Sequence, residues 1–373
     1  MKRLTSLIGL ISIFTLVAGG CAPAPTSPAS PTPAPATVPA ASSTPEATAT
    51  ATIIPTVVTP TPTSIPASSE LVWFAPNFGS QGFVELFTQP DQWAEARAQV
   101  DVFQFYADNV ADGGPCSICG DNSLDAFVRA DAFRKLTDWG IAIGIEYGPI
   151  YPDWDCTSNI VYTNAGKAIR NIRKNGGNVA FLSMDEPLMY GQLDINGKHC
   201  GYNVEKTASV TAGYIERLTS AYPNLSVGDI EPYPHFSVAE LKEWILALEA
   251  QGVSPGFFHL DVDIERVRVE KRNVAADLKE LERFCGEHGI PFGVIITSNW
   301  TAAYSDETYF RSALKWVETI HAAIGKPRHI IFQSWQGPAP SGAHEIPVNL
   351  PGNDPNIFSH TRLIVEGMNI FLP

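Results

Sequence analysis

The sequence has few basic residues, and this shortage excludes one class of partner. Lysine and arginine together number 25, against 39 aspartates and glutamates, which gives a formal net charge of −14. No run of basic residues follows the first three positions. Proteins that bind nucleic acid neutralise its phosphates with clustered Lys and Arg. We therefore expect no nucleic-acid partner.

Common cofactor motifs are also absent. No glycine-rich phosphate loop follows the first strand-like segment, so a nucleotide-binding α/β sheet has little support. The HxH and HExxH patterns of zinc enzymes do not occur either. The sequence therefore predicts no cofactor, and no motif in it predicts a metal.

Residues 22–69 lack aromatic side chains and carry a single charged residue, Glu46. Almost all the others are Ala, Pro, Thr and Ser. Such a segment cannot bury enough apolar surface to offset the entropy lost on ordering it, and its prolines favour an extended spacer. We expect a disordered linker over 21–69, between a signal peptide at 1–20 and a folded domain at 70–373.

A short apolar segment, Leu7–Val17, follows the basic start MKR. It is shorter than the about 20 residues that a helix needs to cross a bilayer, and a basic start, an apolar centre and small residues are typical of a secretory signal. Cys21 follows the small residues AGG in an arrangement that resembles the lipobox of bacterial lipoproteins, although Ala18 stands where Leu is usual. The resemblance implies that Cys21 carries a lipid, which anchors the chain on the extracytoplasmic face of the cell membrane. A cleaved signal with an incidental cysteine is the alternative.

The remaining five cysteines are of two kinds. Cys285 lies in a helical pattern and is predicted to be a buried free thiol. The other four, Cys116, Cys119, Cys156 and Cys200, lie in loops rich in Gly, Pro and Asp. In an exported protein they predict two disulfides, with three connectivities open. Zinc is the alternative, because Cys116 and Cys119 have the spacing of metal ligands.

Strand-like apolar segments alternate with helical patterns along residues 70–373. Stretches such as Val238–Ala250 carry apolar residues at helical spacing, and several end at a glycine just before the next strand. This alternation predicts a parallel sheet, and about eight such units in roughly 300 residues predict a (β/α)8 TIM barrel with enlarged βα loops. A doubly wound open sheet is the alternative. The strands are expected at 71–76, 100–106, 141–147, 178–185, 225–231, 256–262, 291–298 and 329–335.

Polar residues recur at the carboxyl ends of these strands, where the loops of a TIM barrel build the active site. The outer face of each strand is expected to be apolar, so polar residues at every second position are predicted to point inward. On this basis His259 and Asp261 share one face, and so do Asp229 and Glu231. Clustered carboxyl groups have separated pKa values, which suits acid–base catalysis. The candidate substrate-binding residues are Tyr106, Glu146, Tyr147, His259, Asn299, Trp300, Gln333 and Trp335.

The fourth strand ends in Asp185-Glu186-Pro187, which resembles the Asn-Glu-Pro ending of clan A TIM-barrel glycosidases. The resemblance covers three residues at a matching topological position. It implies that Glu186 is the acid/base and that Asp185 stands where the sugar-binding Asn is found. The sequence departs from that family at strand seven, where Asn299-Trp300 replaces the nucleophilic Glu.

The Asp185-Glu186 pair is also similar to that of hexosaminidases that use substrate assistance. This resemblance implies that Glu186 protonates the leaving oxygen, while Asp185 orients the substrate's own acetamido group as the nucleophile. A third option pairs Glu186 with Glu231 or Asp261. A carboxyl separation of about 5 Å would then predict retention and about 6.5–9.5 Å inversion.

The sequence thus predicts a monomeric, extracytoplasmic glycoside hydrolase that acts on a carbohydrate, with catalytic carboxyls drawn from Glu186, Asp185, Glu231 and Asp261. Two alternatives stay open. One is a metal-dependent sugar enzyme whose site combines Glu186, Glu231, His259 and Asp261. The other is a non-catalytic surface lipoprotein that binds carbohydrate.

Overall fold

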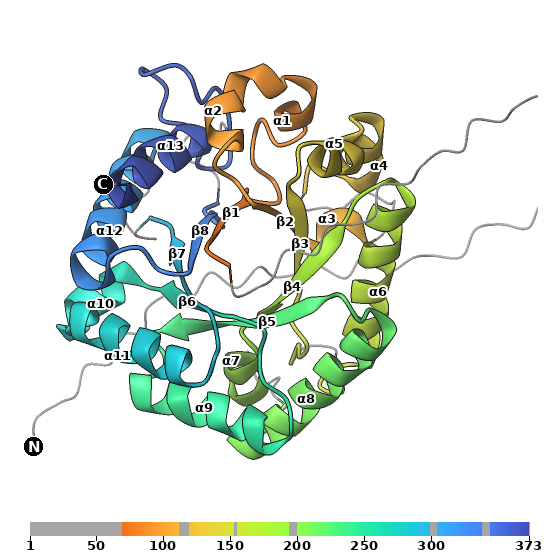
Figure 1. Ribbon diagram of the computed structural model, residues 1–373, viewed down its shortest axis with the longest axis vertical. Coiled ribbons are helices and arrows are strands. Elements are labelled where there is room, and N and C mark those ends of the chain that lie inside the picture. Colours follow the sequence, from red (N-terminus) through yellow and green to blue (C-terminus); the bar gives the residue numbers. More distant parts are fainter. Residues whose placement is uncertain are drawn as a thin grey trace, which may run out of the picture. The chain divides into compact units, whose positions relative to one another are not determined.

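The computed structural model describes residues 69–111, 119–152, 155–193, 200–298, 304–337 and 344–372. Within them, eight parallel strands form one closed barrel (Figure 1). The predicted (β/α)8 TIM barrel is confirmed, and the open sheet is excluded because β8 pairs with β1. The strands are β1 (Leu71–Ala75), β2 (Val102–Tyr106), β3 (Ala142–Glu146), β4 (Val179–Asp185), β5 (Ser226–Tyr233), β6 (Phe258–Val262), β7 (Phe292–Ile296) and β8 (His329–Gln333).

Helices surround the barrel (Figure 1). Their ends follow local signals: Ser237 forms a capping box with Glu240 at the start of α9, and Gly325 follows the end of α12. The helix predicted at Val238–Ala250 is confirmed. The helices are α1 (Glu85–Thr88), α2 (Ala94–Arg97), α3 (Ala107–Val110), α4 (Leu124–Arg129), α5 (Ala132–Asp138), α6 (Asn159–Lys174), α7 (Pro187–Gln192), α8 (Val204–Ala221), α9 (Val238–Ala250), α10 (Ile264–Glu270), α11 (Val274–Glu287), α12 (Asp306–Ile324) and α13 (His360–Phe371).

Two apolar cores follow from the alternation of strand residues. The larger core lies between the barrel and the helices and includes outer-face residues such as Phe74 and Phe105. The smaller core fills the barrel interior with Trp73, Phe181 and Phe257. The centroids of these three rings lie 4.9 to 6.1 Å apart. The interior is therefore a packed core, as expected for this fold.

Two buried imidazoles share this interior. The Nε2 atom of His259 lies 2.9 Å from the Nδ1 atom of His329, and the ring of Trp73 meets that of His259 edge-on. Strand β7 carries Gly293 beside them, where a Cβ atom would lie only 2.7 Å from atoms of both histidines. Burial, followed by the electrostatic effect of His329, lowers the pKa of His259 well below its ordinary value, so the ring of His259 is uncharged at neutral pH.

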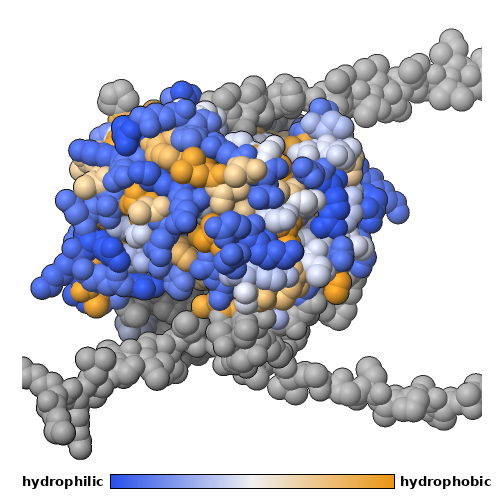
Figure 2. Space-filling view, turned by 90° about the horizontal axis from the view of Figure 1, so that it is seen from below, coloured by the Kyte–Doolittle hydropathy of each residue, from blue (hydrophilic) through white to orange (hydrophobic). Residues whose placement is uncertain are grey.

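The outer surface is mixed in character. Figure 2 shows hydrophilic residues over most of the visible face, with apolar residues between them. Single exposed apolar side chains of this kind are normal on a protein surface. No helix within the described ranges is long and apolar enough to cross a membrane.

Candidate active site

Four carboxyl groups meet at the carboxyl end of the barrel. Glu146 ends β3, Asp185 ends β4, Glu186 follows it directly, and Asp261 lies on β6. Burial raises the pKa of Glu186 well above its ordinary value, and the charges of the other three raise it further. The structure thus brings together Glu186, Asp185 and Asp261 from the predicted catalytic set, and it adds Glu146.

The pKa values within this cluster are separated. Burial, with a smaller contribution from Asp108, raises the pKa of Asp185 to about 6. Burial and the charge of Asp185 raise the pKa of Asp261 to about 7. An ionised carboxylate opposes the ionisation of its neighbours, so a charged Asp185 keeps the proton on Glu186. Near neutral pH the cluster can hold a carboxylate beside a carboxylic acid, which acid–base catalysis requires.

Glu146 is held by side chains from two other strands of the barrel. The Nε2 atoms of Gln104 on β2 and Gln333 on β8 each donate to its Oε2 atom at 2.6 Å. Gln333 also donates to the hydroxyl of Tyr106 at 3.1 Å, and the hydroxyl of Ser183 on β4 donates to Gln104 at 2.8 Å. The predicted residues Tyr106, Glu146 and Gln333 therefore belong to one hydrogen-bonded network.

Glu186 reaches the mouth through an unusual backbone conformation. Adjacent residues of an extended strand point to opposite faces, so a continued β4 would place Glu186 opposite Asp185. Instead Glu186 has φ 44° and ψ 51°, in the left-handed region, and it is the N-cap residue directly before α7. Residues other than glycine rarely adopt this conformation, and where they do, the strain clusters at functional sites.

A group of tyrosines lies beside the carboxyls. Tyr190 is one helical turn beyond Glu186, and its pKa is raised chiefly by the charge of Asp185 and then by burial. Its ring stacks on that of Tyr151, with centroids 5.8 Å apart. Trp335, which follows β8, is half-buried and packs against the interior core. Tyr151 and Tyr190 therefore lie beside the carboxyls, and Trp335 lies just beyond the end of β8.

Glu231 does not point into the barrel, and the prediction for it is corrected. It lies on the outer face of β5 with Val227 and Tyr233, which belong to the core beneath the helices. Its Oε1 atom accepts the backbone N–H of Leu188 in α7 at 2.6 Å. Asp229, on the same face, accepts the indole N–H of Trp244 in α9 at 2.6 Å. Polar residues at every second position face outward here because the helices supply donors for them.

Two predicted substrate-binding residues are also placed elsewhere. His259 points inward but lies one layer below Asp261, fully buried against His329 and Trp73. Tyr147 follows Glu146 and therefore faces outward, where its hydroxyl accepts from Asn164 of α6 at 3.1 Å. Neither side chain belongs to the network of Glu146 at the mouth.

The metal-site alternative loses its predicted ligand set, because Glu231 and His259 do not join Glu186 and Asp261. The part of the chain that the structure describes holds no group of three His, Cys, Asp or Glu side chains suited to a metal ion. The predicted residues Asn299, Trp300, Cys116 and Cys21 lie outside the described residues.

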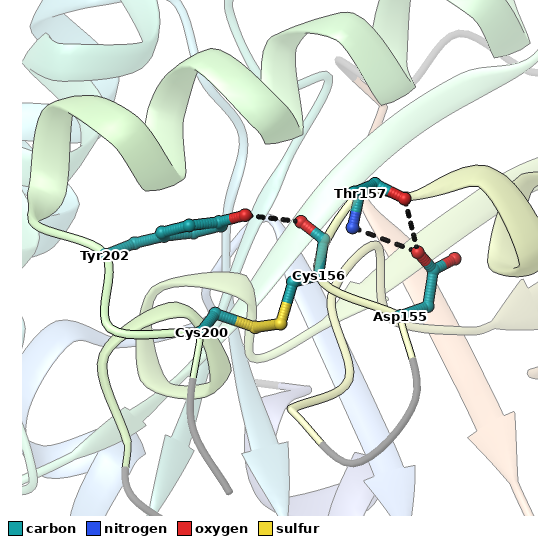
Figure 3. The surroundings of a disulfide bond; sticks show 5 residues. All are labelled: Asp155, Cys156, Thr157, Cys200 and Tyr202. Atoms are coloured by element: carbon teal, nitrogen blue, oxygen red, sulfur yellow. Dashed lines mark hydrogen bonds between the residues drawn. A yellow bond between two sulfur atoms is a disulfide. The ribbon is translucent and has the colours of Figure 1, made fainter.

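A disulfide joins two loops on the active face. Cys156, after β3, is bonded to Cys200, after α7, with their Cα atoms 5.6 Å apart (Figure 3). The hydroxyl of Tyr202 donates to the carbonyl of Cys156 at 3.0 Å in the same corner. The predicted disulfide chemistry is confirmed for this pair, and Cys119 is also disulfide-bonded. Cys285 is a buried free cysteine, as predicted.

No protein-family model matches the sequence, and no curated protein matches it. Solved structures do resemble its fold. The catalytic domain of a GH26 endo-β-1,4-mannanase from Bacillus sp. JAMB-750 has a TM-score of 0.51 at 12% identity, over 81% of this chain and 87% of that chain. GH5_18 from Streptomyces cattleya, in complex with GlcNAc, has a TM-score of 0.50 at 8% identity, over 82% and 81%. A modular endo-β-1,4-mannanase from Cellulomonas fimi has a TM-score of 0.50 at 10% identity, over 83% and 71%. At such identities the likeness establishes the shared barrel fold.

Proposed function

We propose that this chain is a glycoside hydrolase in which Glu186 donates a proton to the oxygen of the bond that breaks. The observation that carries the proposal is the meeting of Glu186 with Asp185, Asp261 and Glu146 at the mouth of a closed barrel. Enzymes that share this barrel include two endo-β-1,4-mannanases and GH5_18 with GlcNAc. Because one fold can host many reactions, the residue assignments rest on the site.

The reaction follows from the two protonation states in the cluster. As the glycosidic C–O bond breaks, its electron pair stays on the departing oxygen, which takes the proton from Glu186. Water then supplies a hydroxyl group to the sugar and returns a proton to Glu186. An ionised carboxylate from the same cluster stabilises the positive charge that develops at the sugar carbon.

Asp185 and Asp261 are the candidates for that ionised group. Asp185 has the lower pKa, about 6 against about 7, so it ionises first. An ionised Asp185 beside the acid is also the arrangement that a substrate-assisted mechanism needs. We therefore propose Asp185 as the group that orients a 2-acetamido sugar, with Asp261 as the second carboxylate for sugars without that substituent. Glu231 is withdrawn from the catalytic pair because it faces the helices.

The Glu186→Gln variant tests the assignment most directly. The amide keeps the size of the side chain but cannot donate the catalytic proton, so we expect the rate to fall about 10²–10⁴-fold. The assay is a panel of 4-nitrophenyl glycosides, with and without a 2-acetamido group, together with β-mannan. The matched control is Asp229→Asn, the same chemical change at a buried carboxyl on the outer face.

Full activity of Glu186→Gln would remove the assignment. If the wild-type protein binds sugars without turnover, and the variant binds them equally well, the non-catalytic alternative is favoured instead. Turnover limited to 2-acetamido sugars, and lost in Asp185→Asn, would support substrate assistance.

We also propose that the enzyme is exported and held at the membrane by a lipid on Cys21. The support is the signal-like segment at 1–20 and the Ala/Pro/Thr/Ser-rich linker that follows it. Cell fractionation of a Cys21→Ala variant checks this proposal, because the variant should no longer sediment with membranes. Continued membrane association of that variant would contradict it.

A further inference from the structure

The side chain of Glu231 lies directly behind the proposed acid, in the layer between the barrel and the helices. Its exposed fraction is zero. Its Oε1 atom accepts the N–H of Leu188 at 2.6 Å, and the N–H of Met189 also donates to the carboxyl. These two amides belong to the first turn of α7, which starts directly after Glu186. Glu231 therefore holds the backbone that follows the proposed acid.

The backbone of Glu186 itself is tied to the same strand. Its N–H donates to the carbonyl of Ile230 on β5 at 3.1 Å, and its carbonyl accepts the N–H of Tyr190 at 2.9 Å. The peptide before the acid and the turn after it are thus both fixed to consecutive residues of β5. The left-handed conformation of Glu186 is strained, so it persists only where surrounding contacts impose it.

Helix α7 cannot impose this conformation alone. It spans only six residues, Pro187–Gln192, and isolated helices of that length are not stable in water. Proline at its first position provides no N–H, so the next two amides are the donors that can tie the turn to a neighbour. Both of them donate to Glu231.

A buried carboxyl is a costly group to use for this purpose. The Oε2 atom of Glu231 has no hydrogen-bond partner among the described residues, and burial of an unpaired polar atom is unfavourable. The geometry points to a compensating role: we propose that Glu231 is a positioning residue, which aims the carboxyl of Glu186 at the substrate through the first turn of α7. This inference rests on the proposed function of Glu186.

The same strand offers a matched comparison. Asp229 lies two residues earlier on the same outer face, is equally buried, and has one oxygen without a partner in the described part of the chain. This carboxyl accepts the indole N–H of Trp244 in α9 and the backbone N–H of Ile230 on its own strand, and neither donor belongs to α7. A variant at Asp229 therefore reproduces the loss of a buried carboxyl without releasing the turn that carries Glu186.

The test compares leaving groups. The 2,4-dinitrophenolate group of a dinitrophenyl glycoside leaves without needing a proton. The phenolate group of the phenyl glycoside of the same sugar leaves only with a proton from the acid. We expect Glu231→Ala to slow the phenyl substrate about tenfold or more, as for a displaced catalytic group, and to leave the dinitrophenyl substrate much less affected. Glu231→Gln, whose amide oxygen can still accept the two N–H groups, should restore most of the rate. Asp229→Ala, the matched truncation, should leave the ratio of the two rates unchanged.

An equal loss on both substrates, or no loss on either, would overturn the positioning role. The Glu186→Gln variant, measured in parallel, distinguishes failure of the positioning role from failure of the proposed function. If Glu186→Gln slows the phenyl and dinitrophenyl substrates equally, or slows neither, then Glu186 is not the acid. Amide hydrogen exchange supplies a readout that needs no turnover. Peptides covering 187–192 should exchange faster in Glu231→Ala than in Asp229→Ala, and unchanged exchange would also contradict the inference.

Discussion

Two sets of carboxyls occupy opposite faces of the same barrel wall. Glu146, Asp185 and Asp261 face inward and raise the pKa values of one another or of Glu186. Asp229 and Glu231 face outward, and each accepts an N–H group from a helix. The residue type is the same in both sets, so residue type alone does not separate a reactive group from a supporting one. Two structural features do separate them: Asp185 and Asp261 are partly exposed beside other carboxyls at the mouth, whereas Asp229 and Glu231 are fully buried against donors in the helix layer.

Among the tests of this contrast between inward and outward carboxyls, we expect the largest effect from replacing Glu146. In Glu146→Gln the amide oxygen can still accept from Gln104 and Gln333, so the network and the stability should be kept. Burial raises the pKa of Glu146 well above its ordinary value, so the variant replaces a carboxyl that can give or take a proton with an amide that cannot. A hydrogen-bonding group left without its partner costs about 1–3 kcal/mol, so kcat/KM on aryl glycosides should fall about 10- to 100-fold.

The same variant should shift the pH dependence. The charge of Glu146 is one of the causes that raise the pKa of Glu186. Without it, Glu186 loses its proton at a lower pH, so the alkaline limb of the pH–rate profile should move to lower pH. Asp229→Asn, the same exchange on the outer face, is the control. If the alkaline limb of the pH–rate profile does not move in Glu146→Gln, then the inward carboxyl does not affect the pKa of Glu186, and the contrast with the outer face is wrong.

Replacing Asp229 should have a smaller effect, on the pH dependence of the free energy of unfolding. Burial raises the pKa of this carboxyl from its ordinary 3.8 to about 8. A group whose pKa is raised on folding stabilises the fold fully below its unfolded pKa, and this contribution is lost as the pH rises through 8. Asparagine cannot ionise, so the free energy of unfolding of Asp229→Asn should fall less between pH 5 and pH 9 than that of the wild type. We expect a difference of about 1 kcal/mol or more, measured by urea unfolding. Parallel pH dependence of the two proteins would contradict it.

The barrel could be predicted from the sequence because strand and helix patterns are local. The same alternation also placed His259 and Asp261 on the inner face correctly. It could not give depth along the barrel, so the packing of His259 against His329 was missed. It also could not predict the hydrogen bonds of the outer face. The indole N–H of Trp244 reaches Asp229, and an amide of α7 reaches Glu231, only in the folded chain.

Tyr147 and Glu186 illustrate the two limits of alternation. Tyr147 directly follows the inward Glu146, and this parity alone could have placed it on the outer face. By the same parity Glu186 should face away from Asp185, and only its left-handed backbone returns it to the mouth. The short Glu-Pro junction was the signal for a helix start there, because proline favours the first helical position.

The aromatic and imidazole rings inside the barrel have a consequence for how a polymer could be handled. Trp73, Phe257 and the two histidines close the passage between the two ends. A long chain cannot be threaded through the strands. A polysaccharide substrate of the proposed enzyme would therefore lie across one open rim, and both fragments of a cut chain would depart on the side from which the intact chain arrived.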